Sequence, residues 1–186
     1  FQLLPFAEAF GFDPSRLEDV GTGAAGPDTP GRWIRVAPDV RILAIEGDHA
    51  PHFEGRTLFH GIRSRPLEEA PGPATEWLDG ATLAFLVDVL NPDGTVGLRI
   101  YYEDGVPREP AGRIPSPEIL GDSVGVDLAL LIPDAFAESD WYPESLLANL
   151  RPARVLVQHW EDFFAPVGRE PRPLPLSDVP GFVART

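Results

Sequence analysis

The sequence contains no cysteine, no methionine and no lysine among its 186 residues. The absence of cysteine excludes disulfides, thiolate metal ligands and a cysteine nucleophile, so a metal ion would have to be held by imidazole and carboxylate groups. No apolar run reaches the roughly 18 residues of a membrane-spanning helix, so we expect no membrane span. Because the chain begins at Phe1 without methionine, we expect a processed or excised piece whose targeting signal cannot be observed. The compartment stays open, with the cytoplasm slightly favoured.

Positive charge is scarce, and this narrows the classes of partner. The chain carries 29 acidic and 15 basic residues, for a net charge of −14, and it has no basic run. Such a surface repels a phosphate backbone, so we expect no nucleic acid partner. A small-molecule substrate or a divalent cation fits the charge balance better.

The composition is otherwise that of a globular domain with many turns. Hydrophobic residues make up 43% and charged residues 24%, beside 22 prolines and 18 glycines. This length and composition suit a single domain spanning 1–186. Within it we expect an apolar connector and a Gly/Pro-rich loop over 1–31, a core of sheet and helix over 32–166, and a Pro-rich tail over 167–186.

Short apolar runs predict a β-sheet. The turn Asn91-Pro92-Asp93-Gly94 combines the fixed φ of proline with a glycine that tolerates a positive φ, which predicts a hairpin between its flanking strands. The nearly unbroken apolar run 126–133 predicts a strand buried on both faces. Strands are expected at 33–38, 40–45, 81–90, 96–102, 126–133 and 153–158.

One helix is predicted between the last two strands. It covers 141–150, where the leucines fall on one side and Pro143 suits the first turn, and Ser139 or Asp140 is expected to cap it. A strand, helix, strand order implies a parallel crossover, whereas the hairpin implies antiparallel pairing. We therefore predict an α/β fold with a mixed β-sheet and flanking helices.

Three of the strands run directly into a residue that can bind a metal ion, namely His49, Asp104 and His159. Strand ends of one sheet gather at one edge, where rigid backbone holds side chains that solvent still reaches, as a catalytic metal site requires. His52 competes with His49, because both lie in one loop. Glu103 competes with Asp104, although neighbours on a continuing strand would point to opposite sides.

Four segments, in this order and spacing, resemble the later half of metallo-β-lactamase-fold hydrolases. They are GDHAPHF, ATLAFLVDV, RIYYEDG and NLRPARVLVQHWEDFF, within residues 33–166. The resemblance is greatest to the branch of ascorbate-6-phosphate lactonase and N-acylphosphatidylethanolamine phospholipase D. Members of that branch often end in a Leu-x-Pro-x-Arg turn, an apolar strand and His-Trp-Asp-Asp-Phe-Phe, and here Glu161 replaces the first aspartate of this ending.

The resemblance implies a fold, a reaction and a role for each strand-end residue. It implies that the chain is the C-terminal part of an αββα sandwich. His49 would match the family's third metal-binding motif, Asp104 its bridging carboxylate and His159 its last histidine. One or two Zn²⁺ or Mn²⁺ ions would activate a water held by Asp104 as the catalytic group, for hydrolysis of an ester, lactone, amide or phosphodiester bond.

The chain departs from the family in lacking the first metal-binding motif, His-x-His-x-Asp-His, because it has only four histidines. We expect either that this motif lies in an N-terminal half of the same protein, which then becomes a partner, or that the chain is an inactive relative. A hypothesis from another class is a non-catalytic half-sandwich. Its large exposed apolar sheet face would dock a partner domain or its own copy in a homo-oligomer.

Further residues are expected to line the pocket or to support the ligands. For Asp134 the alternative to this role is a helix cap. For Glu161 and Asp162, which follow Trp160, the alternative is exposure to solvent on the surface. His60 is expected to pack in a loop or in the core. The supporting residues are His52, Asp134, Trp160, Glu161 and Asp162. The aromatic residues Trp141, Tyr142, Phe163 and Phe164 are expected in a pocket wall or, more commonly for such side chains, in the core.

Overall fold

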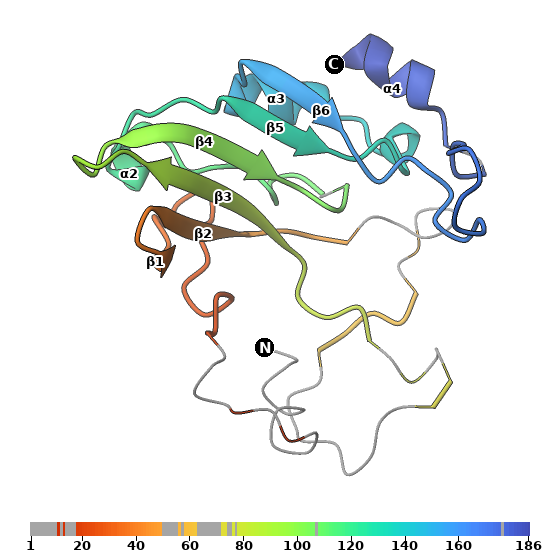
Figure 1. Ribbon diagram of the computed structural model, residues 1–186, viewed down its shortest axis with the longest axis horizontal. Coiled ribbons are helices and arrows are strands. Elements are labelled where there is room, and N and C mark those ends of the chain that lie inside the picture. The colour runs from red at the N-terminus through yellow and green to blue at the C-terminus, as the bar shows by residue number, and fades with distance from the viewer. Residues whose placement is uncertain are drawn as a thin grey trace.

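Six strands form one mixed sheet in the computed structural model, which describes residues 11, 13, 18–49, 56, 58–62, 72–73, 76, 78–106, 108–175 and 177–186. The strands follow chain order across the sheet, antiparallel from β1 to β4 and parallel from β4 to β6 (Figure 1). The predicted α/β class with a mixed sheet is therefore confirmed. The strands are β1 (Trp33–Ala37), β2 (Val40–Glu46), β3 (Leu83–Leu90), β4 (Val96–Tyr102), β5 (Leu128–Leu131) and β6 (Arg154–Val157).

Short helices follow the later strands. No helix in the described ranges is both long and apolar enough to cross a membrane. The connector expected over 1–10 lies outside the described residues. The helices are α2 (Pro117–Leu120), the 3-10 helix η3 (Phe136–Glu138), α3 (Glu144–Leu150) and α4 (Val179–Arg185).

The β3–β4 hairpin turns at 91–94, as predicted. The Asn91 amide donates to the Thr95 carbonyl over 2.8 Å, and the Gly94 amide donates to the Asn91 carbonyl over 2.9 Å. Gly94 has a φ of 83°, which residues with a side chain adopt only with strain. The hairpin register sets Asp88 directly opposite Arg99.

One face of the sheet carries the hydrophobic core. The register places Leu43, Leu86, Tyr101, Ala129 and Val155 in one row across five strands. The first four of these side chains are completely buried. Helices α2 and α3 lie behind the sheet on this side (Figure 1), and two buried leucines of α3 join the same core cluster.

The opposite face, which we call the open face, is apolar, and no helix among the described residues covers it (Figure 1). Its central row is Ala44, Phe85, Tyr102, Leu130 and Leu156. None of the described helices lies in front of this row in Figure 1. Exposure rises along the row from a buried alanine to a leucine that is 52% exposed.

The open face corrects the prediction for the run 126–133. Only 128–131 form β5, and the strand is buried on one face alone. Ala129 and Leu131 are buried, whereas Leu128 and Leu130 are half-buried. An unbroken apolar run predicts burial on both faces only where both faces are covered, and here the described helices cover one.

Helix α3 begins later than predicted and has no side-chain cap. Pro143 occupies the cap position, and no side chain there bonds to the first turn, so the predicted cap at Ser139 or Asp140 is wrong. The reason is the buried Tyr142, whose hydroxyl donates to the Ile132 carbonyl over 2.8 Å. This bond draws the preceding segment into the core before the helix starts.

The Pro-rich tail over 167–186 contains helix α4, which the sequence pattern did not indicate. Phe182 in this helix is completely buried. It stacks on Tyr142 with ring centroids 5.7 Å apart and meets Phe136 edge-on at 5.4 Å. The tail therefore contributes to the core. Asp178 caps the helix by accepting a hydrogen bond from the Gly181 amide over 2.9 Å.

We predict that Asp178→Ala lowers the free energy of unfolding by about 1 kcal/mol, because the helix loses its N-terminal cap. Asp140→Ala is the matched control: it removes an exposed aspartate that precedes a helix without capping it, so little change is expected. Urea denaturation of both variants measures the difference. An equal loss in the two variants would contradict the assignment of the cap.

Candidate functional site

Asp104 and His159 meet beyond the C-terminal ends of β4 and β6. Asp104 Oδ1 lies 2.9 Å from His159 Nδ1, and the two side chains are 46% and 39% exposed. Strand β5 lies between β4 and β6 and is parallel to both, so the three strands end at one edge of the sheet. Two of the three strand-end residues singled out from the sequence therefore come together.

Backbone and side-chain bonds fix the chain on both sides of this pair. The Gln158 side chain donates from Nε2 to the Glu103 carbonyl over 3.0 Å. The Glu103 amide donates to the Leu130 carbonyl over 3.1 Å, and the Gln158 amide donates to the Leu131 carbonyl over 2.9 Å. His159 has a φ of 52°, a left-handed conformation that costs a non-glycine residue about 1 kcal/mol. The surrounding bonds hold the imidazole in this orientation.

Tyr102 supports the carboxylate of the pair. Burial raises the pKa of the Tyr102 hydroxyl, and the charge of Asp104 and the hydrogen bond between the two side chains raise it further. The phenol therefore stays protonated, and its hydroxyl donates a hydrogen bond to Asp104. The carboxylate is held between this hydroxyl and the imidazole of His159.

Glu103 points away from solvent into the core, on the side opposite to Asp104. It is completely buried, and this burial raises its pKa to about 7, against the lowering effect of bonds from the Tyr101 hydroxyl and the Gly105 amide. The Tyr101 hydroxyl lies 2.8 Å from Glu103 Oε2 and 2.7 Å from the Gly112 carbonyl. The single proton of this hydroxyl is shared between two acceptors, so its bond to Glu103 lowers the pKa of that carboxyl less than burial raises it.

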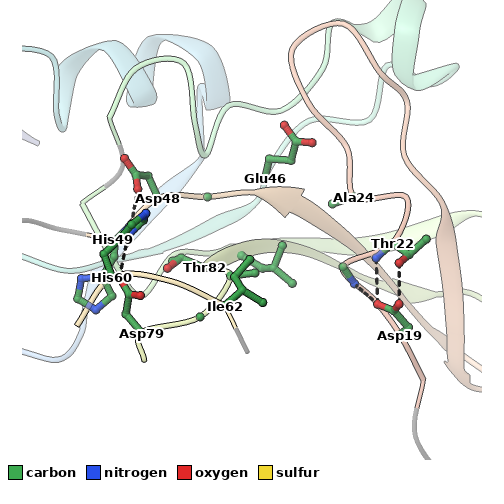
Figure 2. A pocket seen from close by; sticks show the side chains of 15 residues that line it. Asp19, Thr22, Ala24, Glu46, Asp48, His49, His60, Ile62, Asp79 and Thr82 are labelled. Atoms are coloured by element: carbon green, nitrogen blue, oxygen red, sulfur yellow. Dashed lines mark hydrogen bonds and ion pairs between the residues drawn. The ribbon is translucent and has the colours of Figure 1, made fainter. Parts of the chain in front are cut away.

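His49 lies beyond β2 in a pocket of about 760 Å³. Figure 2 shows it beside His60 and Asp79 at one end of this pocket. His60 Nδ1 is 3.3 Å from Asp79 Oδ2, and the Gly61 amide donates to Asp79 Oδ1 over 2.8 Å. Burial raises the pKa of Asp79, but the Gly61 amide and His60 outweigh it and lower that pKa below its usual value. The exposed His60 therefore faces a carboxylate, in a pair that the sequence did not indicate.

The loops that follow β2 and β4 touch each other. A Cβ atom on Gly105 would lie 3.1 Å from the Asp48 carbonyl oxygen, so glycine permits a close approach there. This contact brings the loop of His49 beside the loop of Asp104. Across the residues that the structure describes, no three side chains of His, Asp or Glu are grouped closely enough to hold one ion. His52, the alternative ligand in the first loop, lies outside those residues.

Asp162, the second residue of the acidic pair after Trp160, holds a loop together. The Asp162 side chain is 6% exposed and pairs with Arg172 at 2.7 Å, so the alternative of a solvated surface residue is wrong for Asp162. Glu161 is exposed. Trp160 is half-buried, and its carbonyl accepts a hydrogen bond from the Leu174 amide over 2.9 Å. These residues shape the loop beside the pair of Asp104 and His159.

The structure contradicts two of the alternatives drawn from the sequence, the helix cap at Asp134 and the core position of Phe163 and Phe164. Asp134 is exposed and does not cap η3, whose cap position is Ala135. Tyr142 is buried in the core, as expected, but Phe163 and Phe164 are 57% and 82% exposed. The chain turns outward after His159, which carries these two rings to the surface.

Sequence analysis also missed a buried network of charges on the core face. The Arg99 and Asp88 side chains are completely buried and bonded at 2.7 Å. Arg99 also donates to Asp122 over 2.8 Å, and Arg41 lies 2.8 Å from Asp88. The Trp33 ring lies under both guanidinium groups, at 4.2 and 5.3 Å. The signal of this network in the sequence is one charged residue within each of the apolar strands β3 and β4. The hairpin register places these two residues, Asp88 and Arg99, opposite each other.

Comparison with known proteins adds no family to this description. No family model, no curated protein and no solved structure matches the chain. The resemblance to metallo-β-lactamase-fold hydrolases therefore stays a prediction from sequence motifs.

Proposed function

We propose that this chain takes part in metal-dependent hydrolysis of a small-molecule substrate, with Asp104 and His159 as two ligands of a divalent ion. The supporting observation is their contact of 2.9 Å at the solvent-facing ends of two strands. A carboxylate and an imidazole suit Zn²⁺ or Mn²⁺. Two ligands are too few for either ion, so the proposal requires others. His49 in the neighbouring loop is one candidate, and His52, outside the described residues, is a second.

The chain's own side chains would position the reacting groups. The contact of Asp104 Oδ1 with His159 Nδ1 holds the two side chains where one ion would bind both, the ion taking the place of the proton between them. Tyr102 keeps its proton and holds the carboxylate in turn. A bound divalent ion supplies a Lewis acid and an activated water, which suit ester, lactone, amide and phosphodiester bonds alike.

We predict that His159→Ala weakens Zn²⁺ binding by the intact protein by at least about 100-fold, because removing a ligand costs more than the roughly 10- to 100-fold found when a hydrogen-bonded partner of a ligand is removed. Isothermal titration with Zn²⁺, and separately with Mn²⁺, measures the affinity. The expected reason is the loss of an imidazole ligand of the ion.

His60→Ala is the matched control for this experiment. His60 also faces an aspartate, at 3.3 Å, but its side chain is 74% exposed. Its removal should leave the affinity unchanged. The proposal fails if the intact protein binds neither ion, or if His159→Ala binds them as tightly as the unchanged protein.

The open face supports a second hypothesis, a non-catalytic docking module. Two apolar sheet faces pack about 10 Å apart in β-sandwiches, and the row from Phe85 to Leu156 offers such a face. Two copies of the chain would each bring a net charge of −14, which opposes self-association. The occupant proposed is therefore the apolar sheet of a partner domain.

Light scattering distinguishes a partner sheet from a second copy of the chain as the occupant of the open face. A particle with the mass of one chain that binds a dye for exposed apolar surface supports a missing partner sheet. A stable dimer would assign the open face to a second copy instead. A monomer that binds no such dye would contradict docking altogether.

A further inference from the structure

Two exposed aromatic rings stand next to the Asp104 and His159 pair. The rings of Phe163 and Phe164, which we call the aromatic lip, have centroids 4.5 Å apart. Phe163 meets the His159 ring edge-on, with centroids 5.2 Å apart and an interplanar angle of 72°. The two side chains are 57% and 82% exposed. The lip is thus an apolar surface in direct contact with a proposed metal ligand.

The backbone beneath the aromatic lip is fixed, so the exposure of the rings is built into the loop. Asp162 accepts from the Phe164 amide over 3.1 Å and from Arg172 Nη2 over 2.7 Å. The Asp162 amide donates to the Arg172 carbonyl over 2.7 Å. Water-facing apolar groups on a rigid support beside a polar site are typical of surfaces that bind an apolar group.

The charge around the lip restricts what the apolar group can be attached to. The chain carries a net charge of −14, and Glu161 beside the lip is exposed. Arg172, a cation of the same loop, is already paired with Asp162. An anionic headgroup such as a phosphodiester is therefore disfavoured next to the lip, whereas a neutral carbonyl compound meets no repulsion.

We propose that the aromatic lip binds an apolar alkyl or aryl group of a neutral ester, lactone or amide, whose carbonyl then lies beside Asp104 and His159. The proposal rests on the proposed hydrolase function and narrows its substrate class. Contact of the apolar group with Phe164 and with the edge of Phe163 directs the bond to be cleaved toward the pair.

Binding without chemistry tests the lip first. Hexanamide, benzamide and acetamide share one neutral headgroup and differ in the apolar group. Hexanamide and benzamide should shift the NMR signals of the His159 ring and the Trp160 indole, and acetamide at equal concentration should not. Phe164→Ala should weaken that binding about tenfold, or about 1.4 kcal/mol, because the apolar group then covers less apolar surface of the protein. The relative response to hexanamide and benzamide distinguishes an alkyl from an aryl group.

Val36→Ala is the matched control, because Val36 is an apolar side chain on β1 with 55% exposure. It should bind the amides like the unchanged protein. Equal responses to hexanamide and acetamide, or an equal loss in both variants, would overturn the proposal.

Ester hydrolysis separates this proposal from the function on which it rests. With metal added, 4-nitrophenyl hexanoate should be cleaved with a higher kcat/KM than 4-nitrophenyl acetate, and Phe164→Ala should remove that preference. Hydrolysis without any preference would refute the lip and leave the hydrolase. Amide binding at the lip without hydrolysis of either ester would refute the hydrolase and leave the lip.

Discussion

Arg99→Met is expected to lower the free energy of unfolding by about 3–5 kcal/mol, the cost of removing one partner from a buried ion pair. Asp88 is completely buried and takes two bonds from the Arg99 guanidinium, at 2.7 and 2.8 Å. Without these two bonds, the Asp88 carboxylate would still be paired with Arg41, at 2.8 Å. Asp122, whose pKa Arg99 lowers, would also lose two bonds. Chemical denaturation followed by circular dichroism measures the change.

Two controls separate burial from the presence of an ion pair. Arg185 makes equally short bonds to Glu144, at 2.6 and 2.7 Å, but on the surface. Arg185→Met should therefore change stability far less. The double variant Arg99→Met, Asp88→Leu removes both buried charges and should recover part of the loss. If Arg99→Met were no more harmful than Arg185→Met, the network would not stabilise the sheet.

Stability is expected to fall by about 3 kcal/mol as the pH rises from 4.5 to 7, through Glu103 alone. Burial raises the pKa of this carboxyl from its usual 4.5 to about 7. Between these values the unfolded chain has released the proton and the folded protein keeps it. Raising the pH therefore draws the equilibrium toward the unfolded chain, and the loss is complete above the folded pKa.

Glu103→Gln isolates this contribution. The amide has the same shape and does not titrate, so the stability of the variant should lack this fall between pH 4.5 and 7. Asp79 and Asp122, whose pKa values are lowered from 3.8, titrate below this range in both proteins. Urea denaturation across the range measures both proteins. Parallel curves for the variant and the unchanged protein would show that Glu103 does not carry the slope.

Local patterns predicted the strands and the hairpin well. The turn at 91–94 depends on a glycine with a positive φ and on bonds within the turn, all of which act between near neighbours. The meeting of Asp104 and His159 was also predictable, because parallel strands joined by crossovers end at one edge. The orientation of His49 beside His60 depends on how loops lie over one another, which periodicity does not encode.

The remaining differences come from contacts between distant segments. The Tyr142 hydroxyl donates to the Ile132 carbonyl, and this contact delays the start of α3. Phe182 packs on Tyr142, and this contact stabilises helix α4 within the Pro-rich tail. Neither contact leaves a periodic trace in the sequence. The exposure of the Phe163 and Phe164 rings was unpredictable for the same reason, because the side of the loop that faces water depends on how the loop folds.

The strand order of the sheet has a consequence for biosynthesis. Each strand from β2 to β6 pairs with the strand made just before it, so a ribosome releasing the chain from its N-terminus delivers every strand after its neighbour. The sheet can lengthen in step with translation, without waiting for a distant segment. Helix α4 follows β6 in the chain, so Phe182 joins the core only after the strands of the sheet have been made.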